Sequence, residues 1–190
     1  MSRWDATFLL AFVVYTGIRH VYQKRTAGEE KTERRIDGVE KGLLAFVVLG
    51  SLLVPLLYLV APIFDFADYS LPLYAKLSGV GVAVFALWLF NRSHADLGAN
   101  WSATLELRRG HELVQQGVYR RMRHPMYAAI FLFGLAQLLL LENWIAGPSA
   151  LVSFLPLYLV RTPREEAMMH DAFGEAYAEY AARTGRVLPF

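Results

Sequence analysis

The chain has 190 residues, of which 55% are hydrophobic, and its mean hydropathy of +0.31 is too high for an ordinary soluble domain. The absence of cysteine excludes disulfide frameworks, thiolate metal sites and cysteine nucleophiles. A formal net charge of +2 gives no global basic field for nucleic acid. We therefore expect a single membrane-embedded domain over residues 1–190, with neither nucleic acid nor a metal as partner.

Three uncharged or nearly uncharged segments predict transmembrane helices in residues 1–90. Ala6–Ile18 becomes long enough to span if Arg19 extends from its end toward the membrane surface. Gly42–Phe64 is uncharged over 23 residues, and Leu71–Asn91 carries a single lysine near its start. The N-terminus lacks the features of a cleaved signal peptide.

Two more apolar segments follow in residues 91–190. Pro125–Leu141 and Asn143–Val160 are separated by Glu142 alone, which predicts a tight antiparallel hairpin. With 17 and 18 residues, both lie near the lower limit for a span. A complete and a partial crossing of the bilayer are both compatible with these lengths. The fold class expected is an all-α integral membrane protein with about five transmembrane helices.

The basic residues predict the orientation of these helices. All but two of the 19 Lys and Arg residues lie in the polar segments 19–41, 92–123 and 161–186. Cytoplasmic segments carry an excess of Lys and Arg, so the N-terminus should lie outside and the C-terminus in the cytoplasm. The arginines at 120, 121 and 123 read as topology markers. A site built from the polar segments would face the cytoplasm.

The polar segments differ in character. Gln23–Lys41 reads as a solvated connector, whereas residues 91–125 are too long and too apolar for a disordered loop. Within the latter, "ATLEL" (residues 103–107) alternates like a short strand. After the last apolar segment, Thr162 and Glu165 fit a capping box. They predict a C-terminal amphipathic helix from Pro163 to near Gly185.

That amphipathic helix carries a stripe at helical spacing, which we expect to pack on the hairpin or lie on the membrane surface. Its members are Met169, Phe173, Tyr177 and Tyr180. The five histidines have no metal-ligand spacing, and no hydrolase or phosphate-loop motif is present.

"HPMY" (residues 124–127) starts the fourth apolar segment with Pro125 at the first helical position. The remaining amides of that turn favour an anionic ligand group. Alternatively, His124 caps the helix and Tyr127 belongs to an interfacial aromatic belt. Arg161 can either anchor the helix at the membrane edge or face inward to pair with a substrate anion. His111 and Glu112 can bind a polar ligand or form an ordinary turn.

Together, these blocks resemble the isoprenylcysteine carboxyl methyltransferase family, in particular its short prokaryotic-type members. The resemblance rests on "HELVQQGVYRRMRHPMY" (111–127), the hairpin with "ENW", and "RTPREEAMMHDAFGEAYAEY" (161–180) followed by "RTGRVLP". It covers about residues 91–190, which would form the catalytic half, with loop, hairpin and C-terminal helix.

The resemblance implies an S-adenosylmethionine-dependent enzyme that esterifies a prenylcysteine-type carboxylate and releases S-adenosylhomocysteine. A lipid-like substrate would enter from the bilayer and react at the cytoplasmic face. Arg161 would orient the substrate carboxylate as the catalytic and substrate-binding residue. Cofactor contacts would come from Glu106, His111, Glu112, Leu113, Val114, Tyr119, His124, Pro125, Met126, Tyr127 and Glu165. The reaction needs positioning and desolvation more than a base, because a carboxylate is already a nucleophile.

Three alternatives fit the same sequence less fully. A related methyltransferase could act on a thiol, an amine or a phospholipid headgroup. A reductase resembling the sterol reductases could bind a nicotinamide cofactor at a similar place. A non-enzymatic membrane protein would explain the apolar segments, but it would leave residues 91–125 without a purpose.

Overall fold

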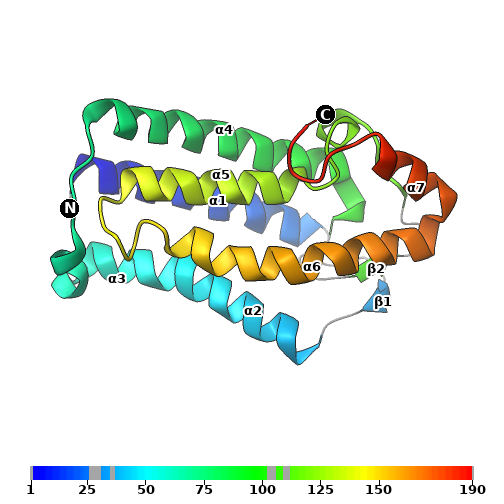
Figure 1. Ribbon diagram of the computed structural model, residues 1–190, viewed down its shortest axis with the longest axis horizontal. Helices are drawn as coiled ribbons and strands as arrows, with labels where there is room; N and C mark the ends of the chain where they lie inside the picture. Colours follow the sequence, from blue (N-terminus) through cyan, green and yellow to red (C-terminus); the bar gives the residue numbers. More distant parts are fainter. Residues whose placement is uncertain (1, 26–30, 35–36, 102–105, 109–111, 190) are drawn as a thin grey trace.

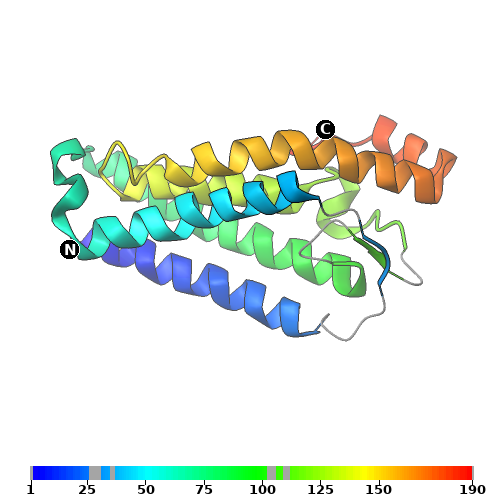
Figure 2. The ribbon, with the colours of Figure 1, turned by 90° about the horizontal axis from the view of Figure 1, so that it is seen from below.

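The computed structural model describes residues 2–25, 31–34, 37–101, 106–108 and 112–189, with the backbone alone at 31–34, 99 and 106–108. Long helices run side by side, and their connections gather at the two ends of the molecule (Figures 1 and 2). The C-terminal α7 and the short strands lie at the same end. The helices are α1 (Arg3–Arg25), α2 (Gly38–Val48), α3 (Val54–Val60), α4 (Leu73–Leu97), α5 (Pro125–Leu140), α6 (Ser149–Phe173) and α7 (Glu175–Ala182).

Shorter elements connect these helices. A π-helical turn, Leu49–Leu53, joins α2 to α3, so that residues 38–60 form one helical segment. Turns of 3₁₀ helix follow at Pro62–Ala67, Gly98–Asn100 and Gly117–Arg120. Strands β1 (Lys31–Arg34) and β2 (Glu106–Arg108) pair antiparallel. The predicted strand at 103–107 is therefore correct at 106 and 107, and its first three residues lie outside the described residues.

The N-terminal helices extend beyond the apolar segments that predict them. α1 continues to Arg25 and α4 to Leu97, so that both enter the segments expected to be polar. Tyr15 of α1 stacks on Phe90 and Phe133 with ring centroids 4.3 and 4.8 Å away. Stacked aromatic pairs stabilise a fold by more than the burial of their apolar area alone. These rings therefore hold α1 against α4 and α5 in the middle of the helix bundle.

The α5–α6 pair forms the predicted hairpin, but with a longer connection than expected. α6 begins at Ser149 and not at Asn143, because residues 141–148 form a turn. A Cβ atom at Gly134 would lie 2.7 Å from Leu151 Cδ2, so glycine allows the two helices to approach closely. The apolar part of α6 is correspondingly shorter than predicted.

Asn143 explains why the helix starts late. The side-chain amide is fully buried and donates to the Phe64 carbonyl and to Asp68 Oδ1, both at 2.7 Å. Its carbonyl oxygen accepts hydrogen bonds from the amides of Ile145 and Ala146, each at 2.9 Å. The first two bonds hold the connection against the 3₁₀ turn at Pro62–Ala67 and the residue after it, and the other two close a local turn at Asn143. This arrangement is incompatible with a helical residue 143.

Replacing Asn143 with alanine should lower the stability of the fold by about 2–4 kcal/mol, because it leaves several buried backbone groups unpaired. Thermal unfolding in detergent should show the lower midpoint. The exposed neighbour Trp144, replaced by alanine, is the matched control. An Asn143→Ala midpoint equal to that of this control would contradict the assignment.

The predicted capping box is wrong, and so is the predicted start of the C-terminal helix at Pro163, although residues 163–173 and 175–182 are helical. α6 runs without a break through Pro156 and Pro163 to Phe173, so Thr162 lies inside a helix and not at its start. The side chain of Thr162 is buried by packing, with 2% exposed. The helix ends at Gly174, whose φ of +52° suits glycine, and α7 follows to Ala182.

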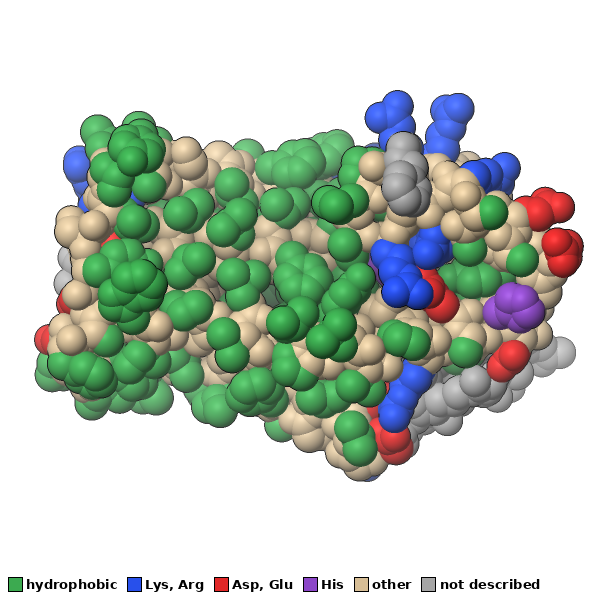
Figure 3. Space-filling view, in the orientation of Figure 1, with side chains coloured by type: hydrophobic (Ala, Val, Ile, Leu, Met, Phe, Trp, Pro, Cys, Tyr) green, Lys and Arg blue, Asp and Glu red, His purple; other side chains and the backbone are tan. Residues whose placement is uncertain are grey.

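The surface divides into an apolar and a charged part. Large apolar side chains are exposed along the helices, among them Leu10 at 66%, Val60 at 78% and Leu159 at 60%. Charged side chains gather mainly at the end that carries α7 (Figure 3). Among the described residues, two helical segments are long and apolar enough to cross a membrane, Gly38–Val60 and Leu73–Leu97.

Candidate active site

A cavity of about 450 Å³ lies between α1, α2, α5, α6 and the segment that precedes α5. This volume is within the range of small-molecule sites. One part is apolar and is lined from α1, the α2 region, α5 and α6 by residues including Phe12, Leu44, Val48, Phe133 and Phe154. The other part carries the polar groups and lies where α6 and α7 meet the 112–127 segment.

The structure brings most of the predicted site residues to this cavity. Those that line it are Glu112, Leu113, Val114, Tyr119, His124, Met126, Tyr127, Arg161 and Glu165. Pro125 is buried at the start of α5 and does not line the cavity. His111 lies outside the described residues, and so does the side chain of Glu106, whose backbone belongs to β2.

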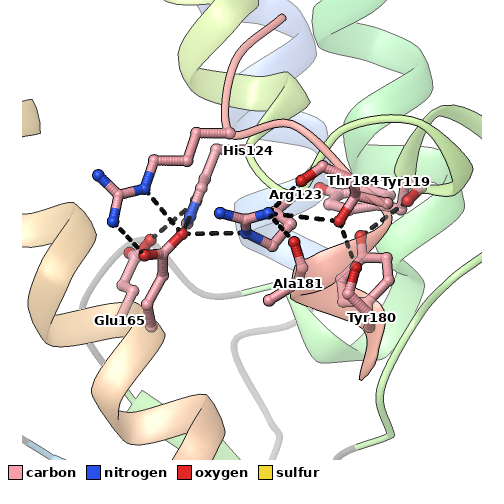
Figure 4. Close-up of polar contacts among 9 residues, drawn as sticks. Tyr119, Arg123, His124, Glu165, Tyr180, Ala181 and Thr184 are labelled. Atoms are coloured by element: carbon pink, nitrogen blue, oxygen red, sulfur yellow. Dashed lines mark hydrogen bonds and ion pairs between the residues drawn. The ribbon is translucent and has the colours of Figure 1, made fainter. Parts of the chain in front are cut away.

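The segment before α5 is held by the C-terminal end of the chain. The amides of Arg123 and His124 donate to the carbonyls of Gly185 and Arg186, both at 2.8 Å. The guanidinium of Arg123 donates to the carbonyls of Ala181, at 2.8 Å, and Thr184. Figure 4 shows the guanidinium of Arg123 directed toward Ala181 and Thr184. Arg123 is therefore a structural residue, and the interpretation of it as a topology marker was incomplete.

Glu166 joins the same segments by charge. Its carboxylate accepts hydrogen bonds from Arg123 Nε at 3.0 Å and from Arg186 at 3.2 and 2.7 Å, and His124 Nε2 lies 3.3 Å away. Burial alone would raise the pKa of Glu166, but the hydrogen bonds from His124, Arg186 and Arg123 outweigh it and lower the pKa to about 2. Glu166 is thus an ionised, partly buried residue whose hydrogen bonds join α6 to the segment before α5 and to the C-terminal segment.

The low pKa of Glu166 predicts acid sensitivity. Because the folded-state pKa lies below the ordinary value, the stabilisation is complete above about pH 4.5 and is lost as the pH falls toward 2. Because Glu166 is only partly buried and its partner Arg186 is exposed, solvent screening reduces the effect, and the wild type should lose about 1–2 kcal/mol over this interval relative to Glu166→Gln. Unfolding midpoints of both proteins between pH 6 and pH 3 test this, and parallel pH profiles would contradict it.

Glu165 is the centre of the polar end of the cavity. Its Oε1 accepts hydrogen bonds from the Tyr127 hydroxyl at 2.7 Å and from Arg161 Nε at 2.8 Å. His124 Nδ1 lies 3.6 Å from Oε2, and the rings of His124 and Tyr127 stack with centroids 5.4 Å apart. The first turn of α5 and the middle of α6 are therefore joined through one carboxylate.

These contacts decide between the alternatives for the "HPMY" turn and Arg161. His124 occupies the N-cap position of α5, but its side chain makes no capping hydrogen bond there and is directed to other partners. Tyr127 is buried, so the aromatic-belt interpretation is wrong. Arg161 faces inward with 7% exposed, so it is not a membrane-edge anchor. Its NH1 lies 3.4 Å from Oε1 of Glu40, a residue of α2 that the sequence patterns did not single out.

Other residues of the cavity wall were not anticipated either. Trp101 is buried, and its indole N–H donates a hydrogen bond to the sulfur of Met126 at 3.3 Å. This contact helps to hold the "HPMY" turn in place. Tyr180 donates its hydroxyl to the carbonyl of Tyr119 at 2.7 Å and, with Tyr177 and Met169, lines the cavity. Most of the aromatic stripe expected to pack or to lie on the membrane thus faces the site.

Several known proteins resemble this chain. The model of the isoprenylcysteine carboxyl methyltransferase (ICMT) family matches residues 79–171. Protein-S-isoprenylcysteine O-methyltransferase B of Arabidopsis thaliana is 30% identical over 156 residues, which cover 76% of this chain and 79% of that protein. The human protein-S-isoprenylcysteine O-methyltransferase is 31% identical over 117 residues, covering 60% of this chain and 41% of its own length.

A solved structure agrees in fold. The eukaryotic intramembrane Ras methyltransferase, an isoprenylcysteine carboxyl methyltransferase, superposes with a TM-score of 0.56 at 22% identity, over 82% of this chain and 54% of that one. The chain spans about half the length of that protein and most of the length of the plant relative. With the family model and the plant relative, the chain belongs to the isoprenylcysteine carboxyl methyltransferase family.

Proposed function

We propose that this chain transfers a methyl group from S-adenosylmethionine to the carboxylate of a prenylcysteine-type lipid, giving the methyl ester and S-adenosylhomocysteine. The observation that carries the proposal is a cavity in which an apolar part joins a polar end built around Arg161 and Glu165. Such a cavity suits a substrate with a long apolar chain and an anionic head. Family membership supports the reaction class.

The described residues fit a methyl donor with an amino-acid part. Glu165 presents a carboxylate to the cavity, which suits an ammonium group, and its position is held by Tyr127 and Arg161. Leu113 and Val114 add apolar surface, and the Glu112 amide is held by Asn100 Oδ1 at 3.0 Å. When bound, S-adenosylmethionine supplies an electrophilic methyl group on a sulfonium.

Arg161 then has one task in the reaction, which is to hold the substrate carboxylate in line with that methyl group. The carboxylate needs no base, since it is already ionised at neutral pH. The apolar wall of the cavity excludes water, which strengthens the attraction between Arg161 and the carboxylate. Orientation and desolvation together account for the proposed catalysis.

We also propose that the protein crosses the membrane about five times, with the N-terminus outside and the polar end of the cavity at the cytoplasmic face. The alternation of basic segments along the chain supports this orientation. The exposed apolar side chains of the helices support the embedding, because soluble proteins rarely expose such surface. The prenyl chain would enter the apolar part of the cavity from the bilayer.

Calorimetry with detergent-purified protein tests the proposal. S-adenosylmethionine should bind with a Kd on the order of micromolar, whereas a reduced nicotinamide cofactor should give no heat. Incubation with an S-farnesylated cysteine that has a free carboxylate should yield the methyl ester. No detectable heat at millimolar S-adenosylmethionine would exclude a methyltransferase, and binding without ester formation would exclude this acceptor.

A further inference from the structure

Glu40 is an ionisable residue buried beside the proposed site. It lies in the first turn of α2 with 2% exposed, outside the residues 79–171 that match the family model. It does not line the cavity. Its Oε1 lies 3.4 Å from NH1 of Arg161, in the middle of α6. The direct contact of Glu40 with the wall of the cavity is therefore the one with Arg161.

The two carboxylates contact different edges of one guanidinium. Glu165 accepts from Nε at 2.8 Å, from the same helix, and Glu40 lies against NH1 from α2. A guanidinium is planar, so contacts at two of its nitrogens determine the orientation of the whole group. Without the contact to Glu40, fewer contacts hold the plane of the guanidinium against turning about the bond between Cδ and Nε.

Glu40 is a costly residue at this position. Neither of its carboxylate oxygens accepts a hydrogen bond from the residues that the structure describes. A buried charge without hydrogen bonds reduces stability even when it is paired, because the ion pair repays only part of the desolvation penalty. Stability alone therefore does not explain a glutamate here, and an effect on Arg161 does.

We infer that Glu40 is a positioning residue that orients Arg161 and thereby sets the preference of the site for a carboxylate over a neutral ester. This inference rests on the proposed function. An oriented guanidinium donates parallel N–H groups to both oxygens of a carboxylate, which a methyl ester cannot accept equally. A misoriented guanidinium loses this paired contact. The preference for the acid over the ester should therefore decrease more than the overall affinity for the lipid.

The chain offers a matched control for this effect. Arg164, one turn beyond Arg161 on α6, pairs with Asp37 at the start of α2 at 3.0 Å, and both side chains are exposed. Arg164→Ala removes an ion pair between the same two helices without touching Arg161. Asp37 itself is unsuitable, because its side chain also caps α2 through the Glu40 amide.

The experiment measures binding of S-farnesylcysteine and of its methyl ester by calorimetry, in the presence of S-adenosylhomocysteine so that no turnover occurs. In Glu40→Ala the ratio of acid to ester affinity should fall about tenfold, and in Glu40→Gln about threefold, since the amide keeps a polar oxygen of the same size beside Arg161 but not the charge. In Arg164→Ala the ratio should stay within about twofold of the wild type. S-adenosylhomocysteine binding reports folding of each variant.

A double-mutant cycle decides whether Glu40 acts through Arg161. In an Arg161→Ala background, Glu40→Ala should change the ratio less than about twofold. An equal loss with and without Arg161, an equal loss in Arg164→Ala, or a higher ratio in Glu40→Gln would each overturn the inference. A wild type that does not prefer the acid would also overturn the inference, whereas a wild type that forms no methyl ester from S-farnesylcysteine would contradict the proposed function, so the two failures are distinguishable.

Discussion

Replacing Arg161 with alanine should lower kcat/KM for methyl transfer to a prenylcysteine carboxylate by about 10²–10³-fold. The guanidinium is almost fully buried at the polar end of the cavity, so water cannot take its place beside a carboxylate. Loss of one desolvated charged contact in a site costs about 3–4 kcal/mol. Initial rates with S-farnesylcysteine, at saturating S-adenosylmethionine, give the comparison.

Arg186→Ala is the control for this variant. Arg186 is an exposed arginine that binds Glu166 and does not line the cavity, so its loss should change kcat/KM less than about threefold. The Arg161→Ala variant also tests the acceptor. A thiol or amine substrate carries no anion for Arg161 to orient, so its methylation would decline far less. An equal rate in Arg161→Ala and wild type with the carboxylate would exclude the proposed role.

Replacing Glu165 with glutamine should weaken S-adenosylmethionine binding by about 10–100-fold, since a charge-assisted contact to an ammonium group is lost. Glutamine can still accept the hydrogen bonds from Tyr127 and Arg161, so the fold should persist. Calorimetry at pH 7 measures the affinity. Circular dichroism of the same samples shows whether the helices are retained.

The next residue along the chain provides the comparison. Glu166 faces Arg123 and Arg186 and does not line the cavity, so Glu166→Gln should keep the affinity within about threefold at pH 7. Its effect should appear in acid stability. Two adjacent glutamates would then have separable roles, one in binding and one in holding the chain ends together. Equal losses of affinity in both variants would contradict this division.

Helix existence was predictable and helix ends were not. Apolar segments locate α1, α4, α5 and the 38–60 helical segment. A long run of apolar residues predicts such a helix from the local sequence alone. Asn143 and Thr162 show where local patterns fail. Asn143 ends a helix through bonds to residues 64 and 68, and Thr162 looks like a cap yet lies within a helix. Both outcomes depend on distant contacts.

For the site, too, some residues were identifiable from the sequence and others only from the structure. The "HPMY" turn, Arg161 and Glu165 were recognisable because the order and spacing of these blocks resemble a family. Physical arguments alone left other roles open for His124, Tyr127 and Arg161, namely a helix cap, a member of an aromatic belt and a membrane-edge anchor. Burial of Tyr127 and Arg161 decided between these alternatives. Sequence gave no signal for Trp101 beyond an aromatic residue in a polar segment.

By itself, the sequence determined that this is an apolar, cysteine-free helical protein with its basic residues in three segments, and it identified the blocks that carry the proposed chemistry. The tertiary structure alone decided which charges meet. Glu40 and Arg161 belong to helices at opposite ends of the chain, and Arg123 is fastened by carbonyls of the C-terminal segment. Hydropathy and helical period are local properties, whereas the partner of a buried charge depends on how whole helices pack.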